Sequence, residues 1–308
     1  MGKRSRTKAR DQAPAGEVGP RQPCPCGSGR RYKACHGSVD GPAAVFVNRP
    51  FEGLPGECDI VAMRELVQSA TAPLTLAGDG RTVRLSTLLP MAAPAMVREG
   101  GDIWLGLQVR HNFGDPSRDL GAVLVSALES EPGIVGLTDP PGEGPRLQDL
   151  VTGTTLEVTV HQGFEHWIDD QDDQAGLAAA LDQANASVNP TARLGSVQSA
   201  YWTDVGPKEH LRWVMPEPED RLLDALARLH AAGRDRLVPD GRFVGMFRAH
   251  GLLTPVWDLP VGTGSEALEE PAAKFAEDLA EALADESALT GDERAARSGL
   301  ANRQVTIR

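Results

Sequence analysis

The chain contains little lysine, little cysteine and no long apolar run. Of its 308 residues only five are lysine and four are cysteine, whereas 26 are arginine. No apolar run approaches the ~18–20 residues that a membrane-spanning helix needs, and the first ten residues lack the hydrophobic segment of a secretory signal. We therefore expect a cytoplasmic protein whose thiols stay reduced, and we predict no disulfide framework.

Two catalytic signatures are also missing. No Gly-x-x-x-x-Gly-Lys-Ser/Thr loop, which would cradle nucleotide phosphates, occurs, and no Gly-x-Ser-x-Gly nucleophile elbow occurs. These absences exclude an ATPase motor of the phosphate-loop type and an elbow-type hydrolase. None of the five lysines stands in a Gly-x-x-x-x-Gly-Lys-Ser/Thr sequence; they are Lys3, Lys8, Lys33, Lys208 and Lys274.

The net charge of −12 is distributed unevenly along the chain. Residues 1–37 contain nine Lys or Arg and two acids, a net charge of +7, and the remaining residues therefore carry −19. Residues 1–20 also lack apolar periodicity, so we predict a disordered basic arm. Such an arm favours an acidic partner, either RNA, the ribosome or an acidic protein. The alternative is a solvated tail that lies against its own acidic domain.

The most specific feature lies between residues 24 and 36. Three thiols and one imidazole stand close together there, from Cys24, Cys26, Cys35 and His36. Three Cys and one His form a closed tetrahedral set for Zn²⁺ and leave no open catalytic position. A segment this short has no core of its own, so metal binding should also fold it. Oxidation of the thiolates with release of the metal is an open alternative role.

This segment resembles the SEC-C motif, the zinc-binding segment at the end of the SecA preprotein translocase that is appended to many other bacterial proteins. The resemblance is carried by Cys24-x-Cys26, the glycines of Gly27-Ser28-Gly29, the Tyr32-Lys33 pair and Cys35-His36. It implies Zn²⁺ held by the four ligands and a docking role towards a protein or the ribosome. The layout of an N-terminal motif before a domain of about 250 residues also resembles an uncharacterised actinobacterial family. The missing phosphate loop argues against a SecA ATPase.

Composition and periodicity divide the chain into five parts. After the arm at 1–20 we predict a SEC-C-like zinc-binding module at 21–38, a linker at 39–57, a domain at 58–262, and a C-terminal helix with a mobile tail at 263–308. Period-2 and period-3.6 patterns are mixed along the domain. The predicted fold class is therefore α+β: a small zinc knuckle followed by a mixed α/β domain with mostly antiparallel strands.

The first half of the domain begins with a hairpin signal. Gly78-Asp79-Gly80 separates two apolar runs, and residues 103–109 alternate as a half-buried strand does. Asp115-Pro116 predicts a helix start, with Asp115 as N-cap, and Pro132-Gly133 follows the helix. A strand at 156–160 and a helix over 177–188 repeat this order, so an internal duplication is one interpretation.

The second half shows further alternating and helical segments. We expect strands near 197–201 and 211–215, a helix that starts at the acids of 216–220 and ends at Gly233, and strands at 242–247 and 252–258. A last amphipathic helix begins near Pro271 with Phe275, Leu279 and Leu283 on one face. The charged residues after about 286 are predicted to be mobile.

Other candidate sites give weaker signals. His161, Glu165 and His166 lack the His-x-x-Glu-His spacing of a helical zinc site, so a loop pair is preferred. The acids at 169–173 fit a solvated helix start better than a cation site. Asp102, His111 and Asp115 surround one strand and form a possible acid/base group. Residues 262–265 have a weak resemblance to a phosphate loop, and Cys58 is expected to be a small buried residue. We expect core or rim packing for the five tryptophans, Trp104, Trp167, Trp202, Trp213 and Trp257.

Three functional hypotheses follow from these features. The first is a zinc-dependent adaptor without catalysis, in which the basic arm and the zinc module dock a protein or ribosomal partner. The alternative is an enzyme of unknown class with its site in the α+β domain, in a pocket that gathers Asp102, His111 or His161. The third is direct nucleic-acid association through the arm, which the acidic body disfavours.

Overall fold

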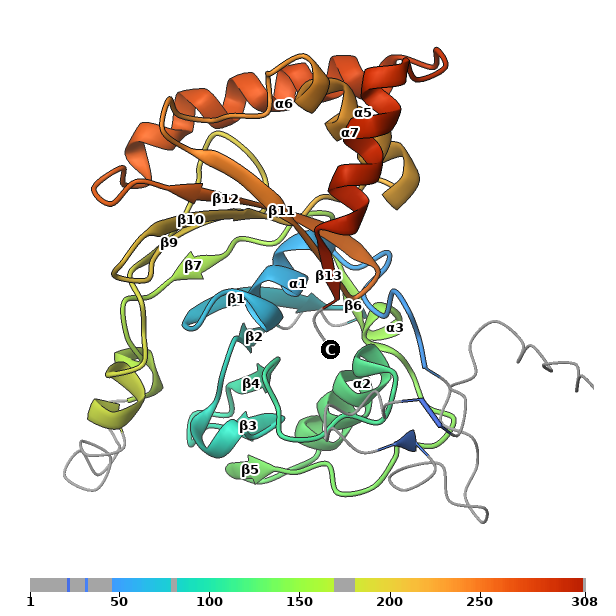
Figure 1. Cartoon of the computed structure of the whole chain (residues 1–308). Coiled ribbons are helices and arrows are strands. Elements are labelled where there is room, and N and C mark those ends of the chain that lie inside the picture. Colours follow the sequence, from blue (N-terminus) through green and yellow to red (C-terminus); the bar gives the residue numbers. More distant parts are fainter. Residues whose placement is uncertain (1–20, 23–30, 33–45, 79–81, 169–180, 307–308) are drawn as a thin grey trace, which may run out of the picture.

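The computed structural model describes residues 21–22, 31–32, 46–78, 82–168 and 181–306 (Figure 1). The predicted arm, the four metal ligands Cys24, Cys26, Cys35 and His36, and the acids at 169–173 lie outside these residues. Within the described part the fold is α+β with two sheets, and most strand pairs are antiparallel. This agrees with the predicted fold class, whereas the zinc knuckle stays a prediction.

The first sheet is built by the N-terminal half of the domain. Its strand order is β5-β3-β4-β2-β1-β6, and β7 also pairs with β1. β2 and β4 are parallel, and the other pairs are antiparallel. The strands are β1 (Ala70–Leu76), β2 (Thr82–Ser86), β3 (Ala95–Val97), β4 (Ile103–Gly106), β5 (Gly133–Val135), β6 (Val151–Thr152) and β7 (Thr159–Val160).

The second sheet is built by the C-terminal half. Its order is β13-β11-β12-β10-β9-β8, with β11 and β13 parallel and the rest antiparallel. The C-terminal strand thus closes one edge of this sheet. The strands are β8 (Thr191–Arg193), β9 (Ala200–Asp204), β10 (Glu209–Trp213), β11 (Arg242–Ala249), β12 (Leu252–Leu259) and β13 (Gln304–Thr306).

Helices cover both sheets (Figure 1). The first three belong to the N-terminal half: α1 (Glu57–Glu65), α2 (Pro116–Leu128) and α3 (Leu147–Leu150). The others cover the outer face of the second sheet: α5 (Glu219–Ala231), α6 (Glu269–Ala284) and α7 (Gly291–Asn302). Short 3-10 turns occur at η2 (Pro90–Ala92), η3 (Glu165–Trp167) and η4 (Glu266–Leu268).

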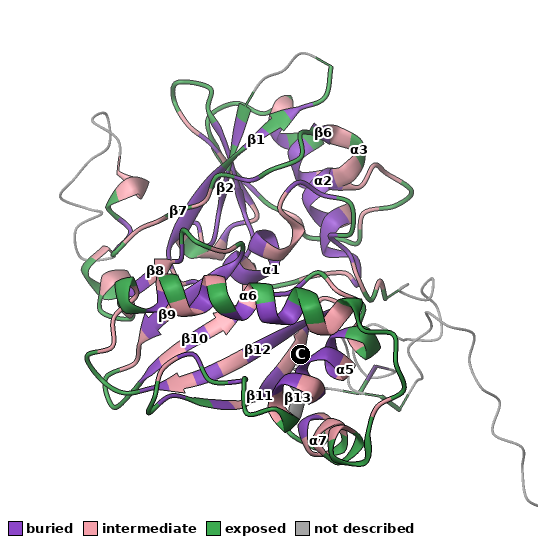
Figure 2. Cartoon of the chain, turned by 90° about the horizontal axis from the view of Figure 1, so that it is seen from above, coloured by how far each residue is buried: buried purple, intermediate pink, exposed green. Residues whose placement is uncertain are grey.

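The two halves are joined by α1, which lies between the sheets. Its buried residues Ile60–Met63 pack in one core with β1, β2 and α2. That core also contains Tyr201, Val214 and Leu252 of the second sheet. A second core fills the space between the second sheet and the helices α5, α6 and α7. Figure 2 shows the outward side of α6 exposed and its inward side buried.

Several local predictions are confirmed because short-range chemistry decides them. β1 and β2 form the expected hairpin, with Thr75 opposite Thr82, although its turn residues 79–81 lie outside the described part. Asp115 caps α2 through its Oδ1, which accepts from the backbone N of Arg118 at 3.4 Å. The acidic start and glycine end of α5 are also confirmed, since Gly233 follows the helix with φ of +67°.

Three expectations need correction. The residues after 286 are not a mobile tail, because α7 packs on α5 through the fully buried Leu300, and β13 pairs with β11. Residues 46–56 of the predicted linker belong to the domain, since Phe51 is fully buried and Leu54 nearly so. The alternating pattern at 103–109 gives a strand that is buried on both faces, and only over 103–106.

The internal duplication is also not supported. The segments that seemed equivalent have different structures: residues 84–86 lie in β2, whereas residues 147–150 form the helix α3. The strand expected at 156–160 is reduced to β7, which has two residues at the edge of the sheet. The predicted helix over 177–188 is described only over its last part, where residues 181–185 are helical.

Candidate functional site

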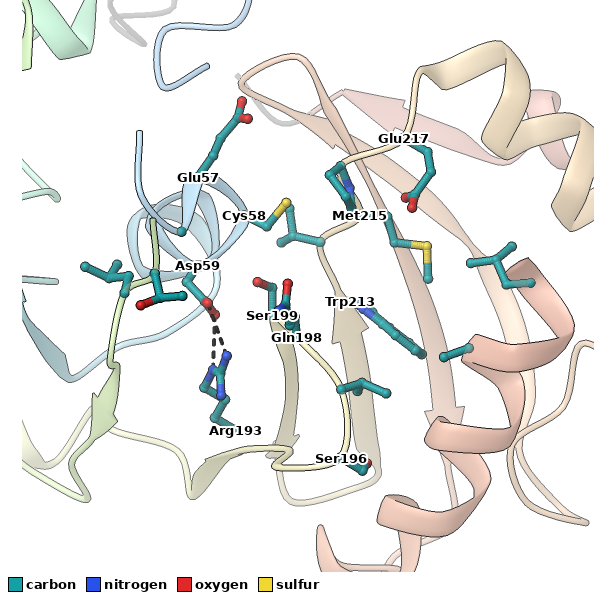
Figure 3. Close-up of a pocket in the computed structure, with 18 of the residues that line it drawn as sticks. Glu57, Cys58, Asp59, Arg193, Ser196, Gln198, Ser199, Trp213, Met215 and Glu217 are labelled. Carbon is teal, nitrogen blue, oxygen red and sulfur yellow. Dashed lines mark hydrogen bonds and ion pairs between the residues drawn. The ribbon is translucent and has the colours of Figure 1, made fainter. Parts of the chain in front are cut away.

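A cleft of about 610 Å³ lies between the two halves of the described structure. One wall comes from the first residues of α1 and the segment 154–157. The other wall comes from residues 196–199, the end of β10 and α6 (Figure 3). Clefts between structural units that combine apolar walls with a few polar groups are common places for ligands to bind. This is therefore the candidate site.

A glycine permits the first wall to form. Gly56 precedes α1 with φ of +61°, in the left-handed region. A Cβ on this residue would lie 2.4 Å from the Cβ of Leu156, which is closer than atoms can approach. Only glycine therefore lets α1 pack directly on the segment 154–157. Glu57 and Asp59 occupy the first turn, where the helix dipole favours negative charge.

An ion pair joins the two walls. Asp59 on α1 binds Arg193 on β8, with both guanidinium-to-carboxylate distances at 3.2 Å (Figure 3). The hydroxyl of Tyr201 donates to Oδ1 of Asp59 at 2.6 Å. Burial, followed by the nearby Asp59 carboxylate, raises the pKa of Tyr201 well above 10, so the phenol stays protonated. These three side chains satisfy one another and position α1 against the second sheet.

Cys58 contributes a thiol to the cleft, and its surroundings make that thiol unreactive. Burial raises its pKa to about 12, and the negative charges of Glu57, Asp59 and Glu217 act in the same direction. The thiolate is the nucleophilic form of cysteine. The thiol is therefore protonated at neutral pH. Cys58 was predicted to be a small buried residue, and it is partly buried against the first core.

Two of the three glutamates that line the cleft, Glu57 and Glu217, differ in their partners. Glu57 is bound by Arg49 through two contacts, at 2.6 and 2.8 Å. Glu217, by contrast, has a buried carboxylate oxygen, Oε2, with no hydrogen-bond partner among the described residues. Figure 3 shows this carboxylate beside Met215. A buried polar atom without a partner costs free energy, so Glu217 is the group in the cleft that a ligand could satisfy.

The wall formed by the second half is mostly apolar. Trp213 and Met215 come from the end of β10 and the residues after it. Leu279 and Leu283 come from α6, on the face that the sequence predicted to be buried. Ser199, also in the lining, has φ of +57°, a strained conformation for a serine. The backbone N of Val214 donates to its carbonyl at 3.1 Å and holds it in place.

The sequence-predicted acid/base group is not assembled. Asp102 and His111 are exposed, while Asp115 binds Arg146 and caps α2. None of Asp102, His111 and His161 lines the cleft. His111 instead lines a cavity of about 20 Å³ beside Asp119, whose pKa is raised to about 6, mainly by burial.

His161 and His166 do come together, as a stacked pair with ring centroids 4.2 Å apart. The ring of His161 contacts the hydroxyl of Thr71 at 2.9 Å. Burial lowers the pKa of His166 to about 4, so its ring is neutral at pH 7. No group of three or more His, Cys, Asp or Glu residues suited to a metal occurs in the described part of the chain. The two histidines thus form the predicted pair, with His161 directly after β7 and His166 in η3.

The loop at 262–265 already holds an anion from its own chain. Backbone N–H groups of Gly262 and Gly264 donate to the carboxylate of Glu209 at 2.5 and 2.8 Å. The indole of Trp202 donates to the same carboxylate at 2.6 Å. The glycines thus bind a buried side chain in the position that the phosphate-loop interpretation gave to a ligand.

Packing roles were expected for the tryptophans, and the structure bears this out. Trp104, Trp213 and Trp257 are buried, and Trp167 and Trp202 are partly buried. The cleft itself was not found from the sequence. Asp59 and Arg193 are 134 positions apart, and Glu217 stands in a Pro-Glu-Pro segment that we interpreted as a helix start. No local pattern links these residues.

The predicted metal ligands can be judged only by their chemistry, since they lie outside the described residues. Three thiolates and one imidazole suit Zn²⁺ in both number and donor type. The donor set of Cys24, Cys26, Cys35 and His36 therefore fits the ion.

In the described part, no helix is both long enough and apolar enough to cross a membrane.

Comparison with known proteins identifies both parts of the chain. The SEC-C motif matches residues 21–38, as the resemblance predicted. A family of unknown function, DUF5926, matches residues 50–308. This second match begins before and ends after the predicted domain at 58–262, and it includes α7 and β13. No curated protein and no solved structure is detectably similar to the chain.

Proposed function

We propose that this chain, which belongs to the family of unknown function DUF5926, is a zinc-dependent adaptor. In this proposal the SEC-C segment docks a protein or ribosomal partner, and the cleft of the larger domain binds a second ligand. The observation that carries it is the SEC-C match at 21–38 together with a complete set of four zinc-type donors. The proposed setting is the cytoplasm, where the thiolates would stay reduced.

The metal has a structural role in this proposal. Cys24, Cys26, Cys35 and His36 would hold Zn²⁺, which supplies a fixed point around which a short segment folds. Four protein donors complete a tetrahedral sphere, so no position is left for a substrate. The basic arm before this segment would add electrostatic attraction to an acidic partner surface.

The chemistry of the cleft supports binding rather than turnover. The Asp59 carboxylate is occupied by Arg193 and Tyr201, and the Cys58 thiol is protonated at neutral pH. Glu57 is likewise neutralised by Arg49. The carboxylates of Asp59 and Glu57 are thus engaged by partners, and the thiol of Cys58 is in its unreactive form. The enzyme alternative required a pocket that gathers Asp102, His111 or His161, and these residues do not line the cleft.

Affinity capture from lysate tests the docking role. We expect the wild type to retain Zn²⁺ by elemental analysis and to enrich a specific set of partners, and Cys35→Ser to lose both. Cys58→Ser is the matched control, because it removes a cysteine outside the zinc-type set, and its metal content and partners should be those of the wild type. Identical partners for wild type and Cys35→Ser would refute the docking role.

A second experiment separates a protein partner from nucleic acid. Deletion of residues 1–20 removes the basic arm and leaves the zinc module. Binding to RNA through the arm would weaken steeply as salt rises and would vanish on the deletion. A partner held by the zinc module should remain bound to the truncated chain. Capture that depends wholly on residues 1–20 and on low salt would contradict docking by the zinc module.

A further inference from the structure

The lining of the cleft is strongly acidic for a space with apolar walls. Its charged residues are four acids and one arginine, a formal net charge of −3: Glu57, Asp59, Glu157, Glu217 and Arg193. The arginine is already neutralised by Asp59 in the ion pair between the walls. Glu57 is paired with Arg49, which lies outside the lining. Glu157 and Glu217 have no ion-pair partner among the described residues, and the cleft therefore attracts positive charge.

Glu217 gives this attraction a specific position. Its Oε2 is buried, yet no described residue donates a hydrogen bond to it. Figure 3 shows the carboxylate beside Met215, above the apolar wall that includes Trp213. A charged donor at this point would satisfy the oxygen and gain a charge-assisted hydrogen bond.

The carboxylates of the lining also act on Cys58. After burial, the causes that raise its pKa are the carboxylates of Glu57, Asp59 and Glu217, and the opposing effect of Arg49 is smaller. A ligand that enters this space with a positive group is favoured over its neutral analogue.

The rest of the lining selects an aliphatic stem behind that charge. Leu279 and Leu283 of α6 and the nearby Trp213 form an apolar surface next to Glu217. Burying methylene groups on such a surface stabilises a complex in proportion to the area removed from water. The geometry points to a ligand with a guanidinium or ammonium group on an aliphatic chain, whose cation reaches Glu217 while the chain lies along α6. This inference rests on the proposal that the cleft is a ligand site.

A free alkyl cation and a basic peptide side chain both present this chemistry. The apolar and acidic groups line one cleft, so the probe need only carry a short stem. Butylguanidinium represents the free form, and a blocked Gly-Arg-Gly peptide represents the peptide form. Butylurea is the neutral control, because it keeps the stem and a planar head without the charge.

Calorimetric titration of the full-length, zinc-loaded chain tests the inference. We expect butylguanidinium to bind at least about tenfold more tightly than butylurea, since hydrogen bonds to charged groups are the stronger ones. If the peptide binds more tightly than butylguanidinium, the cleft is assigned to a basic segment of a partner. If the peptide binds more weakly than butylguanidinium, the cleft is assigned to a free alkyl cation. No binding of either cation, or equal binding of butylguanidinium and butylurea, would overturn the inference.

Variants locate the effect. Glu217→Gln keeps the shape of the side chain and should weaken the binding of butylguanidinium about tenfold while leaving butylurea unchanged. Glu129→Gln changes the net charge equally at an exposed position at the end of α2 and should have no effect. If Glu217→Gln lowers the melting temperature, Glu157→Gln provides the same test, because Glu157 also lines the cleft and is exposed. We expect Glu157→Gln to weaken the binding of butylguanidinium by less than Glu217→Gln does. Unchanged affinity in both lining variants would reject the inferred site.

These measurements are independent of partner capture. Loss of docking in Cys35→Ser with intact butylguanidinium binding would support the adaptor function and the cleft ligand together. Partner capture without any cation binding would leave the adaptor role in place and reject the ligand class.

Discussion

The ion pair between Asp59 and Arg193 should contribute more to stability than any surface pair in the molecule. It joins α1 to β8, and the side chains are 6% and 27% exposed respectively. Removing one partner of a buried pair costs ~3–5 kcal/mol because the other charge stays buried without compensation. Water reaches over a quarter of Arg193, and an asparagine at 59 can still accept from Tyr201. We therefore expect Asp59→Asn to lower the free energy of unfolding by about 2–3 kcal/mol.

Chemical denaturation measures this value directly. Asp102→Asn is the matched control, since Asp102 is exposed and lies outside the cleft, and it should change the free energy of unfolding by less than ~0.5 kcal/mol. A double-mutant cycle with Arg193→Gln should show coupling, because the second substitution removes the charge that the first left without a partner. A loss below about 1 kcal/mol, or strictly additive effects, would refute the reasoning.

Three further predictions test other parts of the described structure. Asp119 has a pKa of about 6 in the folded state, raised from 3.8 mainly by burial, so the folded chain binds more protons than the unfolded chain between these values. Stability should fall as pH rises from 4 to 7, and Asp119→Asn should remove about 2 kcal/mol of that loss, as denaturation at pH 4 and pH 7 will show. Cys58, with a pKa of about 12, should resist iodoacetamide at pH 8 in the folded chain and react after unfolding, a difference measured by mass spectrometry; equal rates would contradict its protonated state. Leu300→Ala should destabilise the protein by ~2–5 kcal/mol, since Leu300 is fully buried between α7 and the second core; a melting temperature equal to that of the wild type would restore the mobile-tail interpretation.

Elements that depend on near neighbours were accessible from the sequence. The Asp115 cap of α2 and the glycine after α5 act within a few residues, so their patterns are visible along the chain. The tail combines both kinds of signal. Residues 291–302 are charged and weakly periodic, but α7 begins at a capping box of Thr290 and Glu293, which is a local signal. Tertiary packing then stabilises the helix, because Leu300 is buried in the second core and Arg297 binds Asp224 and Asp220 of α5.

The sequence by itself determined the zinc-type donor set, because three cysteines and one histidine lie within 13 residues and can be recognised from their spacing. It also determined the class of fold and the starts of α2, α5 and α6. Only the tertiary structure decided the cleft, since Asp59, Arg193 and Glu217 come from α1, β8 and the segment before α5. The charges of Asp59 and Arg193 compensate each other, whereas that of Glu217 does not, because of distances that no local sequence pattern predicts. The acidic character of that cleft is therefore a property of the folded chain, whereas the zinc-type donor set is already present in the primary sequence.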